Sequence, residues 1–176
     1  MREYRTPGSV WGRLGNWAFY HDNEEGEILD FISLLEKQLK DDVVMEILEC
    51  NDIDVVYDFD RTHEGMEDVY WADSKESGFQ FRFDENQKLD VIFLYMVERD
   101  GFTPISRNEV DVPIYESFEQ AKSDFEANNL EYKKPPIEDP ADPWYQRWIK
   151  THNGVYTRHY EFKDNKPRMI TLGLFE

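Results

Sequence analysis

The sequence predicts an α+β domain in which N-terminal helices pack on an antiparallel sheet of at least four strands, with one helix between two hairpins. Three patterns carry this prediction: an apolar stripe at helical spacing near the start, an alternating hairpin in the middle, and a similar hairpin at the end. A chain of 176 residues fits one domain, spanning 1–176. Its 12 Phe, 10 Tyr and 5 Trp provide ample material for a core.

The first third of the chain predicts helices followed by a strand. Residues 1–21 combine aromatic side chains with glycines, which indicates an irregular or extended lead-in. Apolar residues recur at three- and four-residue steps over 25–40 and predict a helix there. Asp41 or Asp42 then caps a short second helix that runs to Leu48. Apolar residues alternate with acids over 53–57, as in a half-buried strand.

The clearest signal is a hairpin over 79–95. Phe79, Phe81 and Phe83 alternate with polar residues, a polar turn follows at 84–87, and a second alternating run extends over 89–95. This pattern is typical of antiparallel strands with one dry face, although the second run is apolar on both sides.

A similar hairpin ends the chain. Tyr160 and Phe162 lead into a polar turn at 163–166, and an apolar run follows over 170–174. A shift of 79 residues superposes Phe81 on Tyr160 and Phe83 on Phe162. Two such hairpins predict at least four antiparallel strands.

One helix is expected between the hairpins. Ser117 and Gln120 stand at the spacing of a capping box, and Asn128–Asn129 would end the helix. Residues 133–143 contain four prolines and predict a loop. Trp144 and Trp148 are expected to re-enter the core after it, on a strand before the last hairpin.

The net charge of −18 is unevenly distributed. Residues 22–73 hold 18 acidic and three basic side chains, which leaves a net charge of −15 in less than a third of the chain. Such a field repels nucleic-acid phosphates and anionic lipid, and it attracts cationic surfaces. We therefore expect a basic protein partner, and neither nucleic acid nor membrane as a direct partner.

Motifs of catalysis and cofactor binding are missing from the sequence. The four histidines lack the spacing of a dedicated metal site, and no phosphate-binding glycine loop or nucleophile elbow occurs. His152 and His159 flank Tyr156 without the acid–base context of a two-histidine nuclease. Cys50 is the one cysteine and is interpreted as a core thiol. A mean hydropathy of −0.77 and the lack of a signal or membrane-spanning segment indicate a cytoplasmic protein. We expect no enzyme activity, cofactor or metal.

One segment suggests an alternative. Asp58-Phe59-Asp60-Arg61-Thr62 follows a predicted strand and resembles the nucleophile loop of haloacid-dehalogenase-type phosphatases. The resemblance implies a magnesium-dependent phosphohydrolase with Asp58 as nucleophile and Asp60 as acid–base group. Arg61 departs from the glycine usual in that family, and the strand before the motif alternates with acids where the family has an apolar parallel strand.

Carboxylates gather with aromatic side chains around the strand at 53–57. Charge pairs would steer and orient a partner rich in Lys and Arg, and the aromatic side chains would anchor it. The candidate partner-binding residues are Asp52, Asp54, Asp58, Asp60, Glu64, Glu67, Asp68, Tyr70, Trp71 and Asp73.

From Asp41 to its end the chain resembles immunity proteins of bacterial polymorphic toxin systems, in particular those of contact-dependent growth inhibition. The resemblance lies in the short helix from Asp41 to Leu48, the hairpin over 78–95, Gly101-Phe102, the helix starting at Ser117 and the terminal hairpin. It implies binding of a cognate toxin domain, often a nuclease, whose active site or substrate surface is blocked. A nuclease attracts phosphate and is therefore basic, which complements the acidic segment. A second alternative is an acidic nucleic-acid mimic that occupies a DNA-binding host protein.

Overall fold

An eight-stranded antiparallel sheet dominates the computed structural model, which describes residues 20–23, 26–58, 68–137 and 139–175. The strands lie in the order β3-β4-β5-β6-β10-β9-β8-β7, and every neighbouring pair is antiparallel. Before the sheet, β1 (Tyr20–Asn23) and β2 (Gly26–Leu29) form a separate two-stranded hairpin. The predicted α+β class is confirmed.

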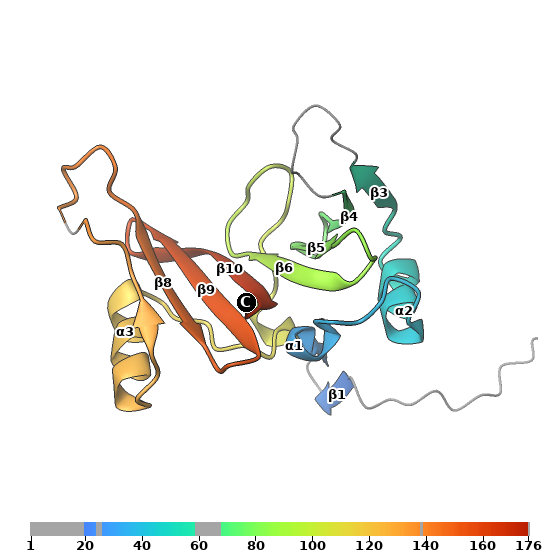
Figure 1. The fold of residues 1–176 in the computed structure, drawn as a ribbon, viewed down its shortest axis with the longest axis horizontal. Coiled ribbons are helices and arrows are strands. Elements are labelled where there is room, and N and C mark those ends of the chain that lie inside the picture. Colours follow the sequence, from blue (N-terminus) through green and yellow to red (C-terminus); the bar gives the residue numbers. More distant parts are fainter. Residues whose placement is uncertain (1–19, 24–25, 59–67, 138, 176) are drawn as a thin grey trace, which may run out of the picture.

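The sheet consists of two four-stranded meanders that meet at their last strands (Figure 1). The first comprises β3 (Val55–Asp58), β4 (Val69–Ser74), β5 (Phe79–Phe83) and β6 (Leu89–Tyr95). The second comprises β7 (Tyr132–Lys133), β8 (Arg147–His152), β9 (Tyr156–Lys163) and β10 (Lys166–Leu174). β6 pairs with β10, so β3 and β7 are the two edges of the sheet.

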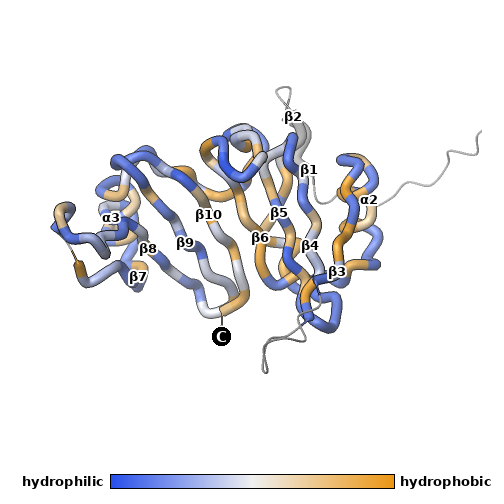
Figure 2. Tube along the Cα trace, turned by 90° about the horizontal axis from the view of Figure 1, so that it is seen from above, coloured by the Kyte–Doolittle hydropathy of each residue, from blue (hydrophilic) through white to orange (hydrophobic). Residues whose placement is uncertain are grey.

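Three α-helices and one 3-10 turn complete the fold of the described residues. α1 (Phe31–Leu34) and α2 (Asp42–Cys50) precede the first meander, while η1 (Arg107–Glu109) and α3 (Phe118–Ala127) lie between β6 and β7. Seen from above, α2 and β3 lie at one end of the sheet, and α3 and β7 lie at the other (Figure 2). None of the described helices is long and apolar enough to cross a membrane.

One face of the sheet carries the core. Phe79, Phe81 and Phe83 of β5 are fully buried on this face, and Phe31 of α1 packs edge-on against Phe79 with ring centroids 5.5 Å apart. At the other end, Phe125 of α3 packs against the core residues of β8 and β9. Ile92 and Leu94 of β6 continue the core to β10, because they pair with Leu172 and Ile170.

The two meanders belong to two copies of one helix–four-strand unit. α2 and α3 end in the same way: the C-cap asparagine donates its side-chain N–H to a backbone oxygen four residues earlier at 2.9 Å, and the next residue has a positive φ. The equivalent positions are Asn51 with Asn128, and Asp52 with Asn129.

Buried strand residues repeat at spacings of 77 to 79 residues. Phe81 and Phe83 correspond to Tyr160 and Phe162, as the 79-residue shift predicts. The buried residues of the next strands correspond at 78 residues, so the predicted 79-residue shift, which would place Val91 on Ile170, is one residue too long for these strands. Further equivalent pairs are Ala72 with Ile149, Ser74 with Thr151, Ile92 with Ile170 and Leu94 with Leu172.

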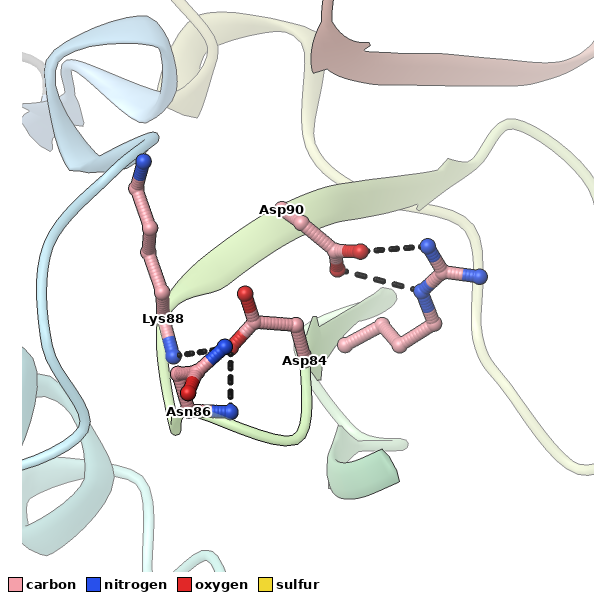
Figure 3. Close-up of polar contacts among 5 residues, drawn as sticks. Asp84, Asn86, Lys88 and Asp90 are labelled. Atoms are coloured by element: carbon pink, nitrogen blue, oxygen red, sulfur yellow. Dashed lines mark hydrogen bonds and ion pairs between the residues drawn. The ribbon is translucent and has the colours of Figure 1, made fainter. Parts of the chain in front are cut away.

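The turns of the two central hairpins differ. Between β9 and β10, Asp164 and Asn165 have φ of 51° and 57° and form a two-residue loop. Between β5 and β6 the loop is longer, and Asp84 closes it by accepting the backbone N–H of Asn86 at 2.9 Å and of Lys88 at 2.8 Å (Figure 3).

The predicted helix over 25–40 is wrong. Residues 26–29 form β2, only 31–34 are α-helical, and Glu36 has a φ of 73°. The backbone N–H groups of Glu36 and Leu39 donate to Leu89 and Gln87 at 2.9 and 2.8 Å. Pairing with the start of β6 therefore replaces the hydrogen bonds that a continued helix would have made.

The predictions for the other helices are confirmed. Asp41 is the N-cap residue of α2, although its side chain makes no capping hydrogen bond, and Ser117 is the N-cap residue of α3, where its hydroxyl accepts the N–H of Gln120 at 3.2 Å. Of the described residues in 133–143, only Lys133 lies in a helix or strand.

Three expected burials are wrong. Cys50 is exposed, because it lies on the outward side of α2. Trp144 is 79% exposed in the loop before β8. β3 is exposed along its whole length and is not half-buried, because its position at the sheet edge leaves it paired on one side only.

Candidate partner-binding surface

The edge strand β3 is the centre of the candidate site. Val55, Val56 and Tyr57 favour extended backbone because they are β-branched or aromatic. α2 ends at Asn51, and the positive φ of Asp52 turns the chain back toward the sheet. Within the part of the chain that the structure describes, β3 pairs with β4 and with no other strand.

The side chains of β3 alternate between the two faces of the sheet. Tyr57 is opposite Tyr70 on the helix-covered side, with ring centroids 4.8 Å apart, and its hydroxyl donates to Asp68 at 2.7 Å. Val56 is opposite Trp71 on the other side. Trp71 in turn lies 6.2 Å from Phe93, between ring centroids. This open face of the sheet therefore carries aromatic side chains next to the edge.

The structure brings most of the described candidate residues together around β3 and β4. Asp52, Asp54 and Asp58 are exposed at the two ends of β3. Tyr70 and Trp71 are consecutive in β4 and therefore lie on opposite faces of the sheet, so a partner on one face contacts only one of them. Asp60, Glu64 and Glu67 lie outside the described residues.

Two of the predicted carboxylates already have partners within the protein. Asp68 accepts from Tyr57, and Asp73 accepts from the side-chain amide of Gln80 at 2.7 Å. Further along the sheet, Arg82 donates to Asp90 at 3.0 Å, so a basic side chain meets the acidic region at β5 (Figure 3). The carboxylate of Asp90 is therefore neutralised by a neighbouring side chain, unlike those at the two ends of β3 in the part of the chain that the structure describes.

α2 contributes three more exposed carboxylates that the sequence analysis left out of the site. Asp42, Glu46 and Glu49 are spaced by four and three residues and so lie along one side of the helix. Figure 1 and Figure 2 both show α2 beside β3. The helical spacing of these acids could have identified them, because the core-facing residues of α2 occupy the opposite side.

Several exposed apolar side chains lie at the same end. Met45 is 38% exposed, Val56 61% and Tyr57 48%. Apolar side chains surrounded by charged ones are typical of protein interaction sites. We call this region the α2–β3 surface, and it comprises Asp42, Met45, Glu46, Glu49, Asp52, Asp54, Val55, Val56, Tyr57 and Asp58.

The carboxylates of the α2–β3 surface take part in none of the ion pairs that the structure gives among its described residues. Those ion pairs lie elsewhere, for example between Lys88 and Glu36 at 3.0 Å. Six like charges at one end of the sheet create a negative potential there.

Comparisons with protein-family models, curated proteins and solved structures give no match. The function must therefore be inferred from the chain itself.

A hollow of about 790 Å³ lies at the opposite end of the sheet, beside β8 and β9. Arg147 in its wall is paired with Glu119, donates to the Tyr145 hydroxyl at 2.8 Å and lies over the Phe118 ring at 4.4 Å. Acidic and basic side chains alternate around it, so it favours no ligand of one charge.

The two C-terminal histidines do not form a pair. His159 borders this hollow and meets Trp148 edge-on at 5.2 Å, and burial lowers the pKa of its imidazole. His152 stacks on Phe175 at 3.9 Å and borders a different hollow.

The Asp58 motif has little support as a catalytic centre. Asp58 ends an antiparallel edge strand, whereas the phosphatase nucleophile follows a parallel strand. Among the described residues, no three His, Cys, Asp or Glu side chains are grouped so that they could hold a metal ion. Asp60 lies outside those residues.

Proposed function

We propose that this protein is an immunity protein of a polymorphic toxin or contact-dependent growth inhibition system. It binds a cognate toxin domain, a basic nuclease, through the α2–β3 surface and covers the active site or the substrate surface of that toxin. The observation that carries the proposal is the exposed apolar strand β3, flanked by carboxylates without ion-pair partners among the described residues.

The chemistry of the surface suits this task. Val55, Val56 and Tyr57 supply apolar area whose burial stabilises a complex. The carboxylates around them attract the Lys and Arg side chains that a nuclease uses to hold phosphate, and they accelerate encounter. Neutralisation by binding is stoichiometric, and it requires no catalytic group in this chain.

The direct test is growth rescue. The chain is co-expressed with the toxin domain encoded next to it, and the complex is also purified from native lysate with mass identification of the bound protein. We expect rescue of growth and a basic toxin domain as the bound protein. If the chain rescues growth from no toxin, and instead displaces DNA from a housekeeping protein, the nucleic-acid mimic would be favoured.

A charge-matched pair of variants tests the surface. Neutralising Asp52, Asp54 and Asp58 to Asn should slow association about tenfold at low salt, because the steering charges are lost. The control changes Glu98 and Glu131 to Gln and Asp164 to Asn; these three residues are exposed away from the α2–β3 surface, and their loss changes the net charge equally. Association rates measured across a salt series should differ between the two triple variants. Equal rates, or rates that do not depend on salt, would contradict the proposal.

A further inference from the structure

We propose that the partner of this protein adds a strand to the open edge of β3, so that the eight-stranded sheet gains one more strand. The added strand is an extended segment of the basic partner with Lys or Arg side chains beside apolar ones. This inference rests on the proposed function and specifies how the α2–β3 surface is used.

The internal repeat provides the comparison on which the inference depends. β3 and β7 occupy equivalent positions, since each follows the helix of its unit and each forms one edge of the sheet. The two edges differ in whether they are protected against pairing with a further strand. β7 has two residues, and Lys133-Lys134-Pro135-Pro136 follows its first residue. Lysine and proline at an edge strand prevent further pairing, so the β7 edge is protected.

The β3 edge lacks this protection. Its four residues, Val-Val-Tyr-Asp, include no lysine, no proline and no irregularity in their register with β4. In an antiparallel pair the backbone groups of alternate residues point away from the neighbouring strand. β3 therefore presents N–H and C=O groups on its outer side, where the structure shows no strand among the described residues. An edge of this kind can pair with an extended peptide.

The charges around β3 select the occupant. Asp54 and Asp58 lie at its two ends, and Asp52 and Glu49 precede it. A second copy of this chain would bring the same acids against each other, which is unfavourable for a protein of net charge −18. A strand with Lys or Arg side chains meets opposite charges at both ends, and its apolar side chains meet Val55, Val56 and Tyr57.

Peptide binding tests the pairing directly. The probe is a capped octapeptide of alternating lysine and valine, and the control is the same peptide with N-methyl groups on its four central residues. Both have the same charge and side chains, but the control lacks the central backbone donors. We expect the unmodified peptide to bind at least tenfold more tightly and to slow amide hydrogen exchange at two of the four residues 55–58. Equal binding of the two peptides, or binding without protection of these amides, would overturn the inference.

Two valine variants give the matched test in the full-length protein. Val56 and Val155 are 61% and 63% exposed, and Val155 lies in the turn between β8 and β9, far along the sheet from β3. Val56→Lys should weaken binding of the Lys–Val peptide at least tenfold, whereas Val155→Lys should leave it unchanged. An equal loss of peptide affinity in both variants would contradict strand addition at the edge of β3.

Failure of this inference is distinguishable from failure of the proposed function. Growth rescue that persists in Val56→Lys, with unprotected β3 amides in the toxin complex, overturns strand addition and leaves the immunity role intact. Absence of rescue by the unmodified protein removes the proposed function itself.

Discussion

Single residues at the junction of the N-terminal part with the core create a titratable pair. Leu29 and Val110 form a parallel bridge, and the residues that follow them, Asp30 and Asp111, bring two carboxyl groups together. Asp30 accepts the N–H of Ser33 at 3.0 Å, and Asp111 accepts that of Phe31 at 3.2 Å. Although residue Asp111 as a whole is exposed, burial of its carboxyl group and the hydrogen bond to Asp30 raise its pKa to about 7.

This pair predicts a stability that falls as the pH rises. The folded state retains a proton on Asp111 between about pH 4 and pH 7, where the unfolded chain has already lost it. The proton on Asp111 therefore stabilises the folded state fully below the pKa of the unfolded chain, and this stabilisation is lost as the pH rises to about 7. Asp111→Asn keeps the shape of the side chain without the charge. Its melting temperature should exceed that of the wild type at pH 8, and this difference should be smaller at pH 5 and disappear below about pH 4. An unchanged difference at the two pH values would contradict the assignment.

At the scale of elements, the β4–β5 turn limits which residue can occupy position 78. Gly78 has a φ of 75°, and a Cβ there would lie 2.4 Å from the Thr103 oxygen and 2.5 Å from the Ile105 nitrogen. The loop after β6 therefore crosses this turn in backbone contact, which only glycine permits.

Gly78→Ala should destabilise the protein by roughly 2–4 kcal/mol, because a backbone clash adds to the cost of a positive φ. Gly154→Ala is the control, since Gly154 also has a positive φ of 91°, but a Cβ added there would have no described atom within 4 Å. We expect about 1 kcal/mol for the control. Urea unfolding of both variants measures the difference, and equal losses would show that the contact with the loop does not matter.

Elements with local signals were predictable, and those defined by distant contacts were not. The caps of α3 and the alternation of β5 depend on nearby residues, and both are confirmed. The apolar stripe at 25–40 is compatible with a helix, but hydrogen bonds to Gln87 and Leu89 determine its backbone. The exposure of β3 likewise depends on its place at the sheet edge, which the alternation of its residues does not encode.

At the scale of the whole molecule, two similar units join through β6 and β10. The sequence indicated a repeated hairpin, and the structure extends the repeat to the helix and all four strands. The pairing of β6 with β10 links residues about 80 positions apart, and a single sequence gives no sign of it. The acidic segment was visible in the composition, but only the fold places α2 beside β3.

The two units should therefore reassemble when the chain is divided. Fragments 1–112 and 113–176, cut in the segment between η1 and α3, should co-purify one to one when expressed together. Burial of Ile92, Leu94, Ile170 and Leu172 holds them together. Ile92→Asp in the first fragment should prevent co-purification, because it places an unpaired charge in the joint. Recovery of the second fragment with the Ile92→Asp fragment would show that β6–β10 pairing is not the main contact.

The repeat also gives the two edges of the sheet to different units, so that one edge can be protected while the other stays exposed. The unit whose outer strand is β7 has a protected edge and contributes to the shared core, so in the proposed complex its surface need not change with the partner. The other copy has the open border, and changes at Val55, Val56 and Tyr57 leave the buried residues of the sheet untouched. Under the proposed function, such a chain can keep binding a toxin whose surface changes, because substitutions at a few solvent-exposed positions leave its fold intact.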